Sequence, residues 1–64
     1  MVEQETIRSR CFRLAGETWG PKGRAVVGWG YSRGLEDEEI LAAIDECARD
    51  EWPVQELAAL LWRP

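Results

Sequence analysis

The fold of this 64-residue chain is decided by residues 36 to 51, EDEEILAAIDECARDE, which hold eight of its twelve carboxylates and one of its eight basic side chains. The stretch predicts an acidic amphipathic helix, because at about 100° per residue its apolar side chains fall within a stripe roughly 120° wide. The stripe consists of Ile40, Leu41, Ile44, Cys47 and Ala48. The opposite side holds Glu38, Glu39, Asp45, Glu46 and Asp50. One face of the helix must therefore be buried, and the other is anionic.

The boundaries of this helix are also readable. With Glu36 at the N-cap, Leu35 and Ile40 can form a hydrophobic staple. Trp52-Pro53 predicts the end of the helix, because proline pushes the preceding residue out of helical geometry and suits the start of the next helix. Residues 54 to 61 follow with apolar side chains at helical spacing, which predicts a short second helix.

Residues 24 to 32, RAVVGWGYS, predict a half-buried strand, because alternate residues from Ala25 to Tyr31 are apolar or aromatic. A strand needs a partner for its backbone groups. Residues 5 to 14 are the candidate, joined to it by the glycine-rich loop 16 to 23, and a bulge is expected near residues 11 and 12. The favoured prediction is an α+β fold: an N-terminal β-hairpin packed on the acidic amphipathic α-helix, followed by a short C-terminal helix, in one domain spanning 1–64.

An alternative for the N-terminal segment stays open. Ile7, Cys11, Leu14 and Ala15 stand at i, i+4, i+7 and i+8, and Gly16 suits the position just after a helix. A helix there would leave residues 24 to 32 needing a strand from another chain, and so would predict an obligate dimer. The sequence thus allows a monomer or a homodimer.

Charge is distributed unevenly along the chain. The net charge is −4, but residues 1–35 sum to +3 and residues 36–64 to −7. The N-terminus lacks the pattern of a signal peptide, and no run approaches the ~20 apolar residues of a membrane span. We therefore expect a soluble, cytoplasmic protein with no membrane partner.

The residues offer little for catalysis. The chain has no histidine to activate a nucleophile, and Cys11 and Cys47 are expected to be free thiols in the core. Neither a zinc site nor a calcium site has the required ligand spacing, so no metal or cofactor is expected. The glycines at 28, 30 and 34 do not make a phosphate site, because the helix that follows begins with four acids. We predict that the protein is not an enzyme.

Four tryptophans stand out in so short a chain. Trp29 and Trp52 are expected in the core, since each ring can bury ~150–250 Å². Trp19, in the predicted loop, and Trp62, near the C-terminus, are expected to be partly exposed. Exposed tryptophan is enriched at binding hot spots, so both are candidate contacts for a protein partner.

Two binding functions follow from these patterns. One is a nucleic-acid-binding module, in which a basic hairpin face supplies cations and stacking rings. Its residues would be Arg8, Arg10, Arg13, Lys22, Arg24, Phe12, Trp19 and Tyr31. The other is an acidic binding protein, which docks Glu38, Glu39, Asp45, Glu46 and Asp50 on the basic groove of a partner protein. The density of carboxylates favours the second.

A short, acidic, non-catalytic domain with Glu36-Asp37-Glu38-Glu39 and Asp45-Glu46 on one helix resembles the small phage-encoded proteins that disarm bacterial defence, anti-CRISPR proteins in particular. It resembles antitoxins on the same grounds. The likeness lies in size, charge and lack of catalytic residues, and no motif carries functional residues over. It implies a stoichiometric inhibitor, a DNA mimic, that occupies the nucleic-acid-binding surface of a nucleoprotein effector complex.

Overall fold

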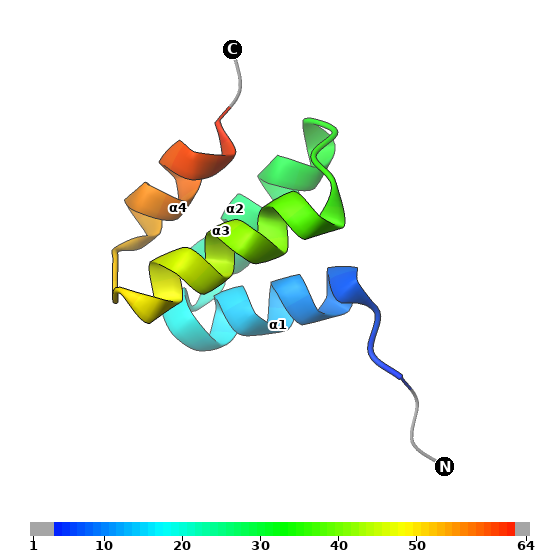
Figure 1. The fold of residues 1–64 in the computed structure, drawn as a ribbon, viewed down its shortest axis with the longest axis horizontal. Coiled ribbons are helices and arrows are strands. Elements are labelled where there is room, and N and C mark those ends of the chain that lie inside the picture. The colour runs from blue at the N-terminus through cyan, green and yellow to red at the C-terminus, as the bar shows by residue number, and fades with distance from the viewer. Residues whose placement is uncertain (1–3, 63–64) are drawn as a thin grey trace.

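The computed structural model describes residues 4–62, and all of the regular secondary structure within that range is helical (Figure 1). Its helices are α1 (Ile7–Trp19), α2 (Pro21–Ser32), α3 (Asp37–Arg49) and α4 (Val54–Leu61). Helix α1 packs on α2 and α3, and α4 packs on α3 and α2. The four helices therefore surround one core. None of them is long and apolar enough to cross a membrane.

The predicted N-terminal β-hairpin, and with it the α+β fold, is wrong. Residues 24–32 lie inside α2, and the segment predicted as the first strand lies largely in α1. The predicted loop is reduced to Gly20, whose φ of 73° turns the chain between the two helices, and Pro21 then opens α2. The open alternative, a helix through Ile7 to Ala15, is correct. That alternative predicted an obligate dimer only because a strand at residues 24–32 would need a partner. As a helix, α2 forms its backbone hydrogen bonds internally, so this reason for a dimer no longer applies.

Helix α1 runs past the point where the sequence suggested it would stop. Thr6 caps its start by accepting a hydrogen bond from the Ser9 N–H at 3.0 Å. Gly16 is not a terminator, because the helix continues through it to Trp19. The Arg24 side chain of α2 lies across Gly16, so close that a Cβ there would be 3.0 Å from Arg24 Cδ. Gly16 thus makes room for a neighbouring side chain.

Helices α1 and α2 lie in close contact at Gly23. This residue is buried, and a Cβ added to it would lie 2.4 Å from the Ala15 carbonyl oxygen. Farther along α2, a Cβ on Gly30 would meet Ile40 and Leu61 at 3.4 Å. Gly23 and Gly30 therefore allow close contact between helices, and they are not part of a bulge in a strand.

The C-terminal half of the chain agrees with the sequence-based prediction. Glu36 is the N-cap of α3, and Glu39 Oε2 accepts a hydrogen bond from the Glu36 N–H at 3.4 Å. The helix ends at Arg49, and the Trp52 N–H donates to the Cys47 carbonyl at 2.9 Å. Helix α4 then begins directly after Pro53.

Every helix contributes to the core, which is built from aliphatic side chains and the two cysteines. Its buried members are Cys11, Ala15, Val27, Ile40, Ala43, Ile44, Cys47, Leu57 and Leu61. Three of the five residues predicted for the apolar stripe, Ile40, Ile44 and Cys47, are among them. The prediction of two core tryptophans is wrong for Trp52, which is 36% exposed, while Trp29 is half-buried against the core. The centre of the core is filled by aliphatic side chains and the cysteines, and Trp52 lies outside it.

The contact between Ala15 and Gly23 can be tested by comparing two glycines of the same helix. Gly→Ala inside a helix ordinarily stabilises by ~0.5–1 kcal/mol. Gly23→Ala is expected instead to destabilise the protein by ~1–3 kcal/mol, because its Cβ would force α1 and α2 apart. Gly28→Ala is the matched control, since a Cβ there meets the Phe12 ring at an ordinary 3.8 Å. Urea unfolding followed by circular dichroism measures both. Equal effects of the two substitutions would show that the close approach is unimportant.

Candidate functional site

The structure brings the five predicted contact carboxylates to the surface on one side of α3 and its C-cap. Glu38, Glu39, Asp45, Glu46 and Asp50 are all exposed, and we call them the acidic face. They face outward because the opposite side of α3 holds the buried stripe. Arg49 is exposed on the same side, four residues after Asp45, and offsets one of these charges.

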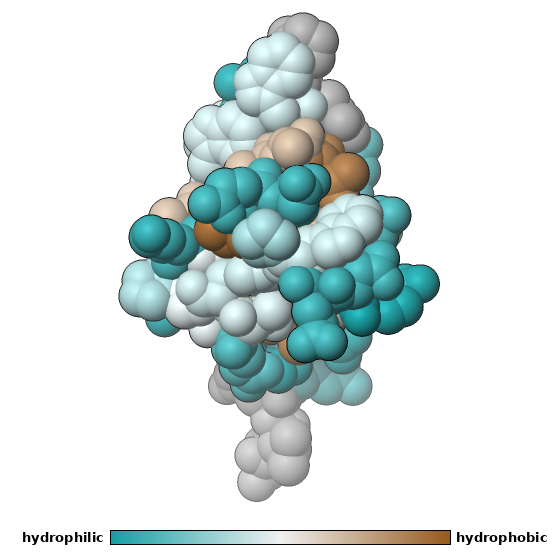
Figure 2. Space-filling model, turned by 90° about the vertical axis from the view of Figure 1, so that its left-hand side faces the viewer, coloured by the Kyte–Doolittle hydropathy of each residue, from teal (hydrophilic) through white to brown (hydrophobic). Residues whose placement is uncertain are grey.

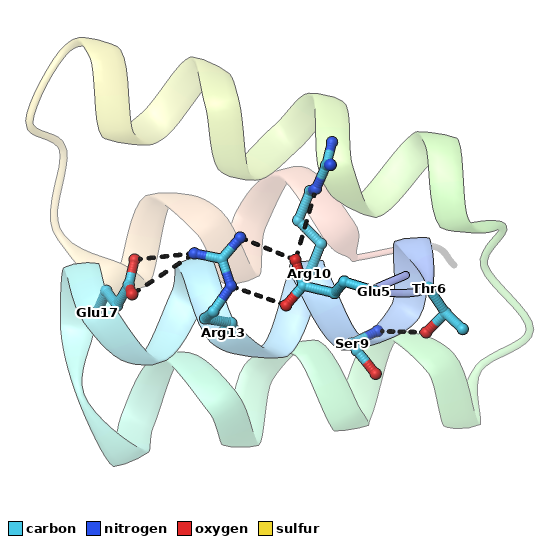
Figure 3. A network of polar contacts seen from close by, with 6 residues as sticks. All are labelled: Glu5, Thr6, Ser9, Arg10, Arg13 and Glu17. Carbon is cyan, nitrogen blue, oxygen red and sulfur yellow. Dashed lines mark hydrogen bonds and ion pairs between the residues drawn. The ribbon is translucent and has the colours of Figure 1, made fainter. Parts of the chain in front are cut away.

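Two arginines of α1, Arg10 and Arg13, pair with acids of α1 and of the residues just before it (Figure 3). The Arg13 guanidinium donates to both oxygens of Glu5, at 2.7 and 2.9 Å, and lies 3.4 Å from Glu17 Oε1. Arg10 Nε lies 3.8 Å from Glu5 Oε1. The hydrogen bond from Arg13 lowers the pKa of the Glu5 carboxyl below its ordinary value. Arg10 and Arg13 are therefore paired with acids of the same part of the chain.

Four of the five carboxylates of the acidic face are not paired with basic side chains in the part of the chain that the structure describes. Arg10 and Arg13 pair with Glu5, and Arg13 also with Glu17, whereas Glu38, Asp45, Glu46 and Asp50 form no ion pair within residues 4–62. Glu39 differs from these four because its carboxylate accepts the Glu36 N–H at the start of α3. Four carboxylates of the acidic face are thus available to a partner, and Glu39 also supports the helix.

The two candidate tryptophans do not lie together. Trp19 is half-buried, and its indole N–H donates to the Trp52 carbonyl at 2.9 Å, which ties the end of α1 to the connection between α3 and α4. Trp62 is 55% exposed at the opposite end of α4. Trp19 therefore has a structural role in this fold, and Trp62 is the more exposed of the two residues.

The nucleic-acid-binding surface was predicted on a β-hairpin, and no such hairpin exists within residues 4–62. The Phe12 ring stacks on Tyr31, with centroids 5.8 Å apart, and the Arg8 guanidinium lies 4.4 Å from the centroid of the Tyr31 ring. Rings engaged with each other in this way offer poor platforms for bases. Nucleic-acid binding by this side of the molecule stays a prediction, and its proposed scaffold was wrong.

A hydrogen bond joins the end of α2 to the start of α3. The Tyr31 hydroxyl donates to Asp37 Oδ1 at 2.5 Å. Burial, together with this bond, raises the pKa of Tyr31 above its ordinary value. Because Asp37 is the first residue of α3, the bond fixes the helix that carries the acidic face.

The cysteines are buried and free, and they lie too far apart to pair. The Cys11 thiol is 3.9 Å from the Asp37 carbonyl oxygen, whereas Cys47 lies ten residues, or ~15 Å, farther along α3. Burial raises the pKa of both thiols, which disfavours the reactive thiolate. Both residues serve as core side chains, as the sequence indicated. The described residues contain no group of three or more side chains suited to hold a metal ion.

Sequence reasoning missed an apolar groove between α2 and α4. Its walls are Ala25, Val26 and Trp29 from α2, and Gln55, Ala58, Ala59 and Trp62 from α4. The signal on α4 was the spacing 55, 58, 59 and 62, which marks one helical stripe. The α2 wall could not be recognised while residues 24–32 were interpreted as a strand.

Comparisons of the chain with protein-family models, with curated proteins and with solved structures found no match. The resemblance to anti-CRISPR proteins and antitoxins therefore stays a prediction from size and charge.

The bond between Tyr31 and Asp37 predicts a dependence of stability on alkaline pH. Because the pKa of Tyr31 is raised in the folded state, its contribution to the free energy of unfolding is complete below about pH 10 and is lost as pH rises toward the folded pKa. Tyr31→Phe is expected to lower stability by ~1–2 kcal/mol at neutral pH and to flatten the loss above pH 10.

Urea unfolding at neutral pH and at several pH values above 9 measures both effects. The cysteines, whose pKa values are also raised, contribute an alkaline decline of their own, and Cys11 interacts with Tyr31. Tyr31 and Tyr31→Phe are therefore compared in a Cys11→Ala background, which isolates the tyrosine. An identical decline in the two proteins would contradict the assigned role of this bond.

Proposed function

We propose that this chain is a non-enzymatic acidic binding protein of the cytoplasm, which inhibits a partner by occupying its basic, nucleic-acid-binding surface with the acidic face of α3. A single observation carries the proposal. Glu38, Asp45, Glu46 and Asp50 are exposed and form no ion pair within residues 4–62, although the chain holds eight basic residues. Exposed carboxylates that outnumber the one arginine beside them, Arg49, are the feature that a basic groove would recognise.

The fold favours such a contact because it holds the carboxylates in place. Residues 38 to 50 span ~18 Å of helix, at 1.5 Å per residue. The helix is anchored by the burial of Ile40 and Ile44 and by the bond from Tyr31 to Asp37. Since the backbone is already ordered, binding costs less conformational entropy than it would for a flexible acidic tail. The same charges would speed association with a basic surface at low salt.

The partner that fits this face is a protein groove lined with lysine and arginine. Such grooves bind nucleic-acid phosphates, so a chain that fills one competes with DNA or RNA. Inhibition of a nucleoprotein effector, in the manner of an anti-CRISPR protein, is one form of this activity. Direct binding of nucleic acid has less support, because Arg10 and Arg13 are paired with Glu5.

Charge reversal on the acidic face tests the proposal. Asp45→Lys and Glu46→Lys, singly and together, are the informative changes, because both residues lie mid-helix and neither caps α3. Wild-type chain on a solid support is expected to retain proteins from nuclease-treated host extract, and a short DNA duplex is expected to displace them. The double variant is expected to lose at least ~90% of this retention, consistent with a loss of more than ~1.4 kcal/mol.

The matched control for each single variant is Glu56→Lys, which makes the same change in net charge on α4, outside the acidic face. It is expected to retain the same proteins, and circular dichroism checks that every variant is folded. Two results argue against the proposal: equal losses with Glu56→Lys and Asp45→Lys, or retained proteins that DNA does not displace. Retention of the wild-type chain on single-stranded DNA, lost with Arg10→Glu, would favour the nucleic-acid-binding alternative.

A further inference from the structure

Helices α1 and α2 leave an open groove beside their contact, which we call the Arg24 groove. It encloses about 870 Å³ and shares no lining residue with the apolar groove between α2 and α4. The Arg24 side chain crosses from α2 over Gly16 of α1, where a Cβ would be 3.0 Å from Arg24 Cδ. The walls that bear on ligand binding also include Phe12, Arg13, Glu17 and Pro21. The groove therefore combines charged and apolar side chains from two helices.

Arg24 is an unpaired cation in this groove. It is exposed, and it forms no hydrogen bond, ion pair or ring contact with any residue between 4 and 62. Arg13 differs, because its guanidinium lies between the carboxylates of Glu5 and Glu17 (Figure 3). All five N–H donors of the Arg24 guanidinium are therefore available to the oxygens of a ligand.

The Arg24 side chain is partly fixed before a ligand arrives. Its Cγ and Cδ atoms lie against Gly16, within 3.1 Å of the position that a Cβ would take there. This contact restricts the aliphatic part of the side chain, so fewer of its conformations are lost when the guanidinium binds. The charge is therefore presented to the groove at a reduced entropic cost.

The apolar wall of the groove lies one helical turn from Gly16. Phe12 precedes Gly16 by four residues, so the two lie on the same side of α1, ~6 Å apart along its axis. The Phe12 ring is half-buried and is held by its stacking on Tyr31, with centroids 5.8 Å apart. Stacking of a base requires an open ring face, whereas an apolar body needs only the part of the ring that borders the groove. One ligand can thus contact both Phe12 and Arg24.

We infer that the Arg24 groove binds an organic carboxylate whose apolar body reaches Phe12. The planar guanidinium fits a carboxylate through two parallel hydrogen bonds. Because Arg13 is already paired with two carboxylates, Arg24 is the arginine of the groove whose charge is left to be matched, and one negative charge matches it. A phosphate monoester would bring a second negative charge close to Glu17, which repels it.

The apolar groove between α2 and α4 provides an internal comparison, because none of the residues that line it is charged. Figure 2 shows apolar surface, in brown and beige, gathered in the upper half of that view, where α4 ends, with hydrophilic side chains around it. An apolar molecule bound there gains nothing from a carboxylate. Dependence of binding on the carboxylate and on Arg24 therefore distinguishes the two grooves.

This inference is independent of the proposed function. The acidic face lies on α3 and its C-cap, whereas the Arg24 groove lies between α1 and α2. Asp45→Lys/Glu46→Lys is expected to bind the carboxylate as the wild type does, after allowance for net charge. Failure of one proposal therefore leaves the other standing.

Three probes with the same apolar body test the class of ligand: naphthoate, the uncharged naphthamide and naphthyl phosphate. Titration of the isotope-labelled full chain at neutral pH, followed by NMR, is expected to show naphthoate shifting the signals of residues 12–17 and 21–24 with a Kd of about 1 mM or tighter. Naphthamide is expected to bind at least ~10-fold more weakly, and the phosphate at least ~2-fold more weakly. Equally tight binding of either analogue, or no saturation by about 10 mM naphthoate, would overturn the inference.

Two matched variants of α2 locate the cation. Arg24→Gln removes the charge and is expected to weaken naphthoate binding at least ~5-fold, with no change for naphthamide. Lys22→Gln makes the same change in net charge at an exposed residue that does not line the groove, and is expected to leave affinity within ~2-fold. Circular dichroism checks that both variants are folded. Equal losses with the two variants, or shifts confined to Ala58 and Ala59 of the apolar groove, would refute the assignment.

Discussion

The structure depends on the burial of one stripe of α3. Its helices have 8 to 13 residues, a length at which an isolated helix is marginal in water. Their stability must therefore come from the shared core, in which Ile40 and Ile44 are almost completely buried. Side chains from α1, α2 and α4 close over this stripe. Because that stripe is held inside, the carboxylates on the opposite side of α3 are held outside, and the acidic face is a consequence of core packing.

Close contact between backbones makes this arrangement possible in so short a chain. At Gly23 there is no room for a Cβ beside the Ala15 carbonyl, and at Gly30 the neighbouring side chains of Ile40 and Leu61 fill the space. The glycines let α2 reach both α1 and the core without long side chains between them. A chain of this size can bury only about 60% of its surface, so close approach of its helices compensates in part for the small number of core residues.

The parts of the fold that the sequence predicted correctly are those in which local signals agree. For α3, the staple residue Leu35, the N-cap Glu36 and the apolar spacing all indicate the same helix, and Pro53 separates it from α4. For residues 24–32 the signals conflict. Alternation of apolar side chains and β-branched valines favours a strand, while Gly23, Val27 and Gly30, all buried, stand at helical spacing. Residues 24–32 form a helix because α2 packs against α1. Local propensity contains no information about that tertiary contact.

Because local sequence signals contain no tertiary contacts, only a surface formed by a single helix could be predicted. The acidic face follows from a single helix, and its exposure could be predicted from α3 alone. The apolar groove between α2 and α4 is formed by two helices that are separated by more than twenty residues, and one of them had been interpreted as a strand. The pairing of Arg13 with Glu17 has an i, i+4 signal, but its bonds to Glu5 depend on how the chain enters α1. Charge segregation along the sequence therefore becomes charge segregation in space only through the fold. Acids accumulate on the outward side of α3, whereas Arg10 and Arg13 of α1 are paired with acids of their own segment. The uneven charge of the sequence therefore appears in the structure mainly as the acidic face of α3.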